Sequence, residues 1–417
     1  MASPSVQAVI PVPYPSRTPE EMIRLASKMV PRLRERQGLC EQQGRLPDVS
    51  NDEFVDAGFY RILQPRRFGG YEFAMPTFMK VMMEVARGCP SSGWVLALTS
   101  GHAIMLSAFF SEEAQIDIYG DTGEFRGPSS TPPRVIATPA TGGWRLTGNW
   151  DYASGIDIST HFIGGIGVPK DDGSVEPRMA ILDRKDYEIV DNWHVVGMRG
   201  TGSRRVQVED VFVPDFRTII PPRDAFNARN APGRKVHANP MYCAGRLTSV
   251  LLGEMAAVAV GAAKGMLDVY EEEVSPKGVR MAPGTRAQQP EFQRHYGQAW
   301  ALIAMAEATV LKVAEDYMEF ARQDVEDGVP FSDERDQQLQ VLEQYATKLA
   351  GDAVDLLFQT GGTSSAHEGS YLQRYFRDMS VLRTHIAAQY ERGAESLGRV
   401  HFTGQVAPVA ALKISPV

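Results

Sequence analysis

Cysteine is scarce in this chain of 417 residues, and an excess of positive charge is absent. The three cysteines, Cys40, Cys89 and Cys243, are odd in number and far apart, so they form neither a disulfide framework nor a CxxC metal site. The formal net charge is −8, so we expect no general attraction to nucleic acid or anionic membranes. The sparse cysteines favour a reducing cytoplasm as the location.

Long hydrophobic runs and targeting signals are also missing. We find no apolar stretch near the roughly 20 residues that a membrane span needs. The segment 1–16 is rich in Pro and Ser and lacks the basic and apolar regions of a signal peptide. We therefore expect no membrane association, and an extended arm over 1–16.

Several catalytic motifs do not occur. The sequence has no P-loop, no HExxH and no GxSxG. The glycines of GGIG (164–167) do not complete a dinucleotide fingerprint, because Lys170 follows where a glycine is needed and no βαβ unit surrounds them. No close cluster of His, Cys and Asp offers metal-ligand spacing. These absences disfavour ordinary hydrolase, nucleotide-transfer and zinc-dependent mechanisms.

The sequence does contain a globular composition, with 43% hydrophobic and 23% charged residues, and its length favours two or three structural units. The pattern is helical over 17–123, alternates with period two over 124–236, and is helical again over 237–417. We predict an α+β fold made of an N-terminal helical domain, a small antiparallel β-barrel and a C-terminal four-helix bundle.

Local signals refine the helical zones. Thr18 and Glu21 have capping-box spacing at the start of the first helix. Residues 94–110 (WVLALTSGHAIMLSAFF) are apolar on nearly every side, so we expect one buried helix there. The run 247–266 is too uniformly apolar to face solvent, which suggests contact with another copy of the chain. The bundle helices are expected at 243–274, 290–323, 333–360 and 370–398.

Five motifs, in order along the chain, carry a resemblance to a known family. They are AGF (57–59), QPRRFGG (64–70), GGWRLTG (142–148), GMRGTGS (197–203) and DVFVP (210–214). With the order helices, strands, helices, they resemble the acyl-CoA dehydrogenase fold. More narrowly, the chain resembles the oxygenase components of two-component, group D flavin-dependent monooxygenases, from about residue 20 to 400.

Two missing glutamates separate the dehydrogenase branch from the monooxygenase branch. An acyl-CoA dehydrogenase needs a carboxylate to remove the α-proton of its thioester. In that family the glutamate follows an Arg-Asp pair near the C-terminus, or precedes an Arg on the first bundle helix. Here Arg377-Asp378 is followed by RTHIA (383–387), and the second position reads Gly245-Arg246. Dehydrogenation is therefore disfavoured.

The monooxygenase resemblance implies a flavin site. Reduced flavin reacts with O2 to give a C4a-hydroperoxide, which survives only where water is excluded and its oxygens and N5 are hydrogen-bonded. The resemblance places Ser154 against flavin N5, and His385, within the last expected helix, beside the peroxide. Tyr152, Trp193 and Thr201 match positions along the flavin.

The same resemblance implies a substrate side and a phosphate contact. His102 and Ser129 match residues that hold a phenolic oxygen, with His102 as its base. Arg294 matches an arginine that family members direct at the flavin phosphate, usually across a subunit interface. Arg246 is a candidate for meeting a substrate anion, or for ordering the flavin or a nearby loop. The stretch 361–365 lacks an arginine that some relatives carry, which leaves FMN and FAD both open.

The resemblance implies the oxygenase component of a two-component system. A separate NAD(P)H:flavin reductase supplies FMNH2 or FADH2, O2 is the co-substrate, and an aromatic, phenol-type small molecule is hydroxylated to a catechol. A substrate carrying nitrogen or sulfur would undergo N- or S-oxygenation instead. Because family members form tetramers, we expect a homotetramer.

Other readings stay open. The chain is alternatively a flavin dehydrogenase with an unrecognised base, or a helical scaffold that has lost its flavin. Six of the candidate residues also have a structural explanation: a core histidine for His102, a helix residue among charged neighbours for His385, ordinary loops for Ser129 and Ser154, a barrel plug for Trp193 and an exposed helix charge for Arg294.

Overall fold

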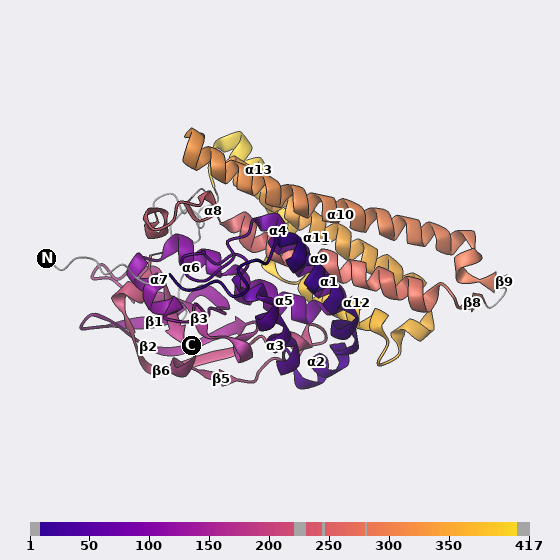
Figure 1. Cartoon of the computed structure of the whole chain (residues 1–417), viewed down its shortest axis with the longest axis horizontal. Coiled ribbons are helices and arrows are strands. Elements are labelled where there is room, and N and C mark those ends of the chain that lie inside the picture. The colour runs from indigo at the N-terminus through magenta and orange to yellow at the C-terminus, as the bar shows by residue number, and fades with distance from the viewer. Residues whose placement is uncertain (1–8, 221–230, 244–246, 280–281, 407–417) are drawn as a thin grey trace.

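The computed structural model describes residues 9–220, 231–243, 247–279 and 282–406 (Figure 1). Helices come first, then a sheet, then longer helices. The helices of the N-terminal part are α1 (Pro19–Glu35), α2 (Gln37–Gln43), α3 (Asp48–Ala57), α4 (Met75–Gly88), α5 (Pro90–Gly101), α6 (Ala103–Phe109) and α7 (Glu112–Tyr119).

Two details of the N-terminal helices bear on the predictions. Thr18 Oγ1 accepts the backbone N–H of Glu21 at 3.3 Å, which confirms the predicted cap of α1. The single helix expected over 94–110 is wrong: α5 ends at Gly101 and α6 begins after His102. Nearly all residues of both helices are buried, as their apolar composition predicts.

The strands form one seven-stranded sheet in the order β5-β6-β2-β1-β3-β4-β7. They are β1 (Ser129–Ala140), β2 (Gly143–Ala153), β3 (His161–Pro169), β4 (Val175–Asp183), β5 (Glu188–Val190), β6 (Arg204–Pro214) and β7 (Thr218–Ile219). Trp150, Phe162 and Leu146 belong to the sheet's own hydrophobic cluster.

The predicted antiparallel barrel is wrong in two respects. The sheet is open, because β5 and β7 are edges that do not pair with each other. It is also mixed, because β1 pairs parallel to β3 and antiparallel to β2. The register between β1 and β3 shifts between Ser130 and Val135, across Pro132 and Pro133, which lack the N–H groups that a ladder needs.

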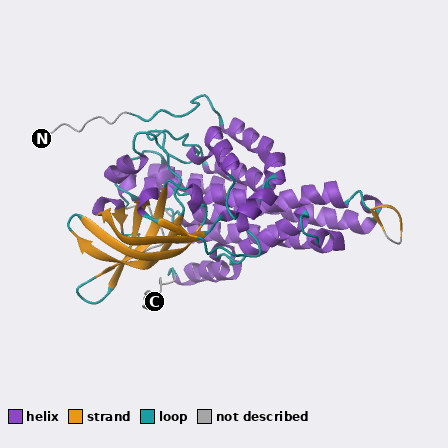
Figure 2. Ribbon diagram, turned by 90° about the horizontal axis from the view of Figure 1, so that it is seen from below, coloured by secondary structure: helices purple, strands orange, loops and turns teal. Residues whose placement is uncertain are grey.

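The C-terminal part is a helical bundle that extends away from the sheet (Figure 2). Its elements are α8 (Pro240–Cys243), α9 (Thr248–Val269), the short hairpin β8 (Gly278–Val279) and β9 (Ala282–Thr285), α10 (Pro290–Arg322), α11 (Asp333–Thr360), α12 (Tyr371–Leu382) and α13 (Tyr390–Thr403). The last helix, expected over 370–398, is instead broken between α12 and α13. Neither Gly nor Pro lies in this break, so the periodicity did not predict it.

Two helical stretches are long and apolar enough to cross a membrane, which corrects the expectation that none approaches that length. They are Pro90–Phe109 and Thr248–Val274. Most of each apolar window, 94% and 78%, is buried inside the protein. The stretch at α9 packs against α4, α11, α10 and α5. The chain's own helices therefore cover most of the run 247–266, and its apolar character does not require a second copy.

Candidate active site

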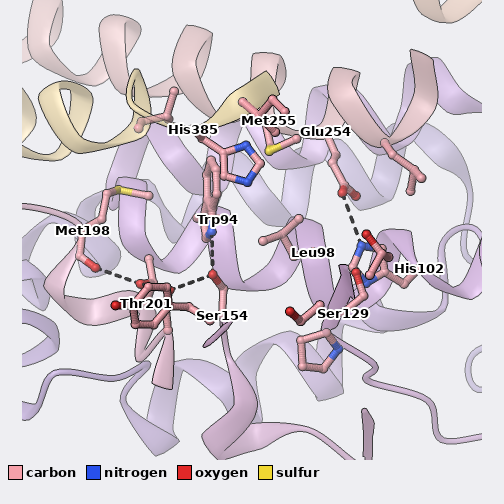
Figure 3. Close-up of a pocket in the computed structure, with 18 of the residues that line it drawn as sticks. Trp94, Leu98, His102, Ser129, Ser154, Met198, Thr201, Glu254, Met255 and His385 are labelled. Carbon is pink, nitrogen blue, oxygen red and sulfur yellow. Dashed lines mark hydrogen bonds and ion pairs between the residues drawn. The ribbon is translucent and has the colours of Figure 1, made fainter. Parts of the chain in front are cut away.

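A cavity of about 730 Å³ lies between α5, the sheet, α9 and the break after α12 (Figure 3). Its volume is in the range of cofactor and small-molecule sites. Of the nine residues predicted for the site, the cavity brings together seven: His102, Ser129, Tyr152, Ser154, Trp193, Thr201 and His385.

The other two predicted residues do not line this cavity in the described chain. Arg294 is exposed on α10, and Arg246 lies outside the described residues. Among the described lining residues there is neither Lys nor Arg. This wall therefore offers no cation for a phosphate group.

One end of the cavity presents a proton acceptor, His102, held at the junction of α5 and α6. Its Nδ1 lies 2.7 Å from the carbonyl oxygen of Gly127, and because a carbonyl only accepts, Nδ1 carries the proton. The lone pair of the neutral ring is then on Nε2. Burial lowers the pKa of His102 to about 4, so the ring is neutral at pH 7.

Glu254, which sequence reasoning missed, faces His102 from α9 (Figure 3). Its Oε1 lies 3.7 Å from His102 Nε2, and the residue is 1% exposed. Burial raises the pKa of Glu254 well above its ordinary value. The available signal was a lone carboxylate within the apolar run 247–266.

At the other end, a chain of hydrogen bonds connects three hydroxyl groups. Trp94 Nε1 donates to Ser154 Oγ at 2.9 Å, and Ser154 contacts Ser203 Oγ at 2.7 Å. Ser203 contacts Thr201 Oγ1 at 2.7 Å, and Thr201 donates to the carbonyl oxygen of Met198 at 2.8 Å. Trp94 and Ser203 were not predicted for the site.

The two ends of this chain fix its direction. Because Thr201 gives its only hydroxyl hydrogen to a carbonyl, it accepts from Ser203, which in turn accepts from Ser154. Ser154, which lines the cavity, therefore has no free hydrogen and one unused lone pair with which to accept a hydrogen bond.

His385 lies in the break between α12 and α13, not inside a helix as expected. Its Nδ1 accepts the backbone N–H of Ala387 at 3.2 Å, so the neutral ring carries its proton on Nε2. Its ring packs edge-on against Trp94, with 5.5 Å between centroids. Partial loss of hydration lowers the pKa of His385. His102 and His385 thus hold opposite tautomers, an acceptor and a donor, fixed by backbone groups.

The loop 197–203 is fastened to α12. The Asp378 carboxylate accepts the backbone N–H of Met198 at 2.6 Å, and burial raises the pKa of Asp378 to about 6. A Cβ on Gly197 would lie 2.0 Å from the carbonyl oxygen of Arg377, so this contact requires glycine. Trp193 Nε1 also donates to the Met198 carbonyl, at 3.0 Å.

These features fit the ring system of a reduced flavin. The ring is flat, and the cavity has aromatic walls at Trp94, Trp193 and Tyr152. Reduced flavin carries a hydrogen on N5, which matches the acceptor lone pair of Ser154. By contrast, no group of three His, Cys, Asp or Glu side chains that could hold a metal ion occurs in the part of the chain that the structure describes.

Comparisons with known proteins give the same picture. Residues 20–119 match the family described as acyl-CoA dehydrogenase, N-terminal domain, and residues 254–390 match acyl-CoA dehydrogenase, C-terminal domain. The chain is 33% identical over 378 residues to a flavin-dependent monooxygenase, oxygenase subunit HsaA, of Rhodococcus jostii (strain RHA1), covering 90% of this chain and 96% of that protein.

Two further relatives carry information on cofactor and substrate. The FADH2-dependent resorcinol hydroxylase, oxygenase component, of Rhizobium sp. (strain MTP-10005) is 28% identical, over 86% of this chain and 88% of its own length. The solved structure of XiaF from Streptomyces sp. in complex with FADH2 and glycerol superposes with a TM-score of 0.85 at 25% identity, covering 95% of this chain and 98% of that one.

Proposed function

The chain belongs to the acyl-CoA dehydrogenase family, in its branch of flavin-dependent monooxygenase oxygenase subunits, and from this we propose that it hydroxylates a phenol-type aromatic substrate. The observation that carries the proposal is the pair of opposite tautomers at His102 and His385 in one cavity.

Reduced flavin, when bound, supplies the electrons with which one oxygen atom of O2 enters the substrate and the other leaves as water. Ser154 accepts a hydrogen bond from the reduced ring through its unused lone pair. Trp94, Trp193 and Tyr152 flank the ring and exclude water from it.

The substrate binds at the other end of the cavity, with its hydroxyl at His102 Nε2 and with Ser129 assisting. His102 takes the hydroxyl proton, because Nε2 holds a lone pair and Nδ1 is already protonated. The negative oxygen raises electron density at the adjacent ring carbon, where the new oxygen enters, and the product is a catechol. His385 donates its Nε2–H toward the reacting oxygen.

A separate reductase delivers FMNH2 or FADH2; the names of the relatives, an oxygenase component and an oxygenase subunit, support a second, reducing component. We further propose a homotetramer in the cytoplasm, in which Arg294 contacts the flavin phosphate of a neighbouring copy. The lack of a cation in the described cavity wall supports this. Arg246 is proposed to meet a substrate anion or to order the site. Light scattering that finds only monomer would contradict the assembly.

The test is to mix the protein and chemically reduced FMN or FAD with oxygenated buffer, with and without a panel of phenols. We expect the protein to change the rate of flavin reoxidation, and 18O2 to place one labelled atom in a catechol. Reoxidation at the rate of free flavin, together with anaerobic reduction of bound flavin by an acyl thioester, would establish the dehydrogenase instead.

A further inference from the structure

Glu254 is a buried carboxyl group that the proposed mechanism leaves unused. It lines the cavity from α9, opposite His102, and is 1% exposed. Its Oε2 has no hydrogen-bond partner among the described residues. Its Oε1 lies 3.7 Å from His102 Nε2, too far for a direct hydrogen bond.

The surrounding fold keeps this carboxyl group in place and uncharged. A Cβ on Gly101 would lie 2.0 Å from Glu254 Oε2, so the space for the carboxyl depends on glycine there. Burial raises the pKa of Glu254 well above its ordinary value, and burial likewise raises the pKa of Glu343 on α11. A buried polar group without a partner destabilises a protein by about 1–3 kcal/mol, so a ligand that supplies the missing partner gains that free energy on binding.

The two facing groups have complementary hydrogen-bonding roles. His102 Nε2 is an acceptor, because its Nδ1–H is bound to the Gly127 carbonyl. A protonated Glu254 is a donor. A single hydroxyl oxygen within hydrogen-bond range of both atoms, which lie 3.7 Å apart, would donate to His102 Nε2 and accept from Glu254.

We infer that Glu254 is a further catalytic residue, a neutral carboxylic acid that donates a hydrogen bond to the substrate's hydroxyl oxygen while His102 removes the hydroxyl proton. This inference rests on the proposed function and adds a second contact to the free hydroxyl that its substrate class requires. Methyl ethers of the same compounds are excluded, because a site built to bind a hydroxyl rejects analogues that lack it.

The proton and the electron pair of the phenol O–H bond are both accounted for in this step. The O–H bond of the phenol breaks, its proton passes to His102 Nε2, and the electron pair stays on the phenol oxygen. Glu254 keeps its own proton and donates it as a hydrogen bond to that pair. The group developing negative charge thus faces a fixed donor in a water-poor site, where such a donor is most effective.

The experiment compares wild type with Glu254→Gln and Glu254→Leu, as full-length protein with FADH2 and O2. The probes are 4-substituted phenols from phenol to 4-nitrophenol, and their methyl ethers. We expect Glu254→Gln, which keeps a donor, to retain hydroxylation within about tenfold, and Glu254→Leu to lose about 10²-fold. The loss with Glu254→Leu should be largest for the least acidic phenols. If Glu254 had only a structural role, the hydroxylation rate would fall by the same factor for every phenol.

Two further measurements keep the inference separate from the proposed function. The infrared difference spectrum of wild type minus Glu254→Gln, without substrate at pH 7, should show the carbonyl band of a protonated carboxylic acid. A carboxylate band there would overturn the inference, as would a Glu254→Leu enzyme that hydroxylates like wild type. The thermal midpoint of Glu254→Leu should not fall, because the change removes an unpartnered buried polar group. If wild type hydroxylates no phenol, the proposed function fails, and with it the role of Glu254, whatever the carboxyl band shows.

Discussion

The two ends of the cavity differ in how their polar groups are satisfied. At the Ser154 end, each hydroxyl contacts a neighbour, and the chain of bonds ends on the Met198 carbonyl. At the His102 end, Nε2 and the Glu254 carboxyl face each other across 3.7 Å with no hydrogen bond between them. A satisfied network holds one shape in advance, whereas unpartnered buried groups gain most from a ligand. We interpret the first end as a preformed cofactor edge and the second as a receptor for the substrate hydroxyl.

The largest effect is expected from His102→Ala, which removes the acceptor of the substrate end. Product formation should fall by about 10²–10⁴-fold, the usual contribution of a positioned general base. Oxidation of reduced flavin should continue and yield H2O2, because the Ser154 end is unchanged. The measurement is the yield of catechol and of H2O2 per reduced flavin consumed. If His102→Ala weakens flavin binding by the same factor as it lowers product formation, the two ends do not act separately.

The burial of His102 should also appear in stability. The folded pKa is about 4, below the ordinary 6.5, so the unfolded chain binds more protons between these values and stability falls as pH drops from 6.5 to 4. By pH 4.5 this contribution costs roughly 2–3 kcal/mol. Urea unfolding of wild type and His102→Gln should be measured at pH 7 and 4.5. The free energy of unfolding should decrease between these pH values by that amount less in the variant than in wild type. His385→Gln is the comparison: the pKa of His385 is also lowered, but this residue is exposed, so its variant should reduce the acid loss by less. An equal change in both variants would contradict the contrast.

His385→Ala tests the donor that lies between the two ends. Losing one hydrogen bond to a charged group costs about 1.5–3 kcal/mol, so the ratio of catechol to H2O2 should fall roughly 10- to 100-fold. His385→Gln, which keeps an N–H, should recover part of the ratio. Product yield per reduced flavin measures both variants. A ratio of catechol to H2O2 in His385→Ala equal to that of wild type would contradict the role assigned to His385.

The smallest effect is expected from Ser203→Ala, which changes the direction of the hydroxyl chain. Without Ser203 as acceptor, the Ser154 hydrogen is free to donate into the cavity, and Ser154 then suits oxidised flavin, whose N5 only accepts. The ratio of the affinities for reduced and oxidised flavin should fall by about fivefold, since one neutral hydrogen bond contributes about 1 kcal/mol. Anaerobic and aerobic titrations measure the two affinities. A wider preference would reverse the deduced donor order.

The order helices, strands, helices follows from local pattern, and the sequence predicts it because period and turn residues are local properties. The two helix breaks at the site were not predictable in this way. His385 separates α12 from α13 with neither Gly nor Pro in the break. At the other break Gly101 precedes His102, but a lone glycine within an apolar helical pattern is tolerated and does not by itself locate a break. The open sheet likewise depends on which distant strands pair with each other. The alternation of polar and apolar residues within one strand does not identify its partners.

By itself, the sequence determined which residue types are available, among them eight histidines, a serine after a predicted strand and a set of aromatic residues. The tertiary structure alone decided their chemistry. The Gly127 carbonyl makes His102 an acceptor and the Ala387 N–H makes His385 a donor, although a histidine in a sequence has no preferred tautomer. In the sequence, Glu254 is one acidic residue in an apolar helix. In the fold it is buried opposite His102, and burial raises its pKa, which favours the neutral acid. Desolvation is a property of the folded chain, so the sequence alone did not show this.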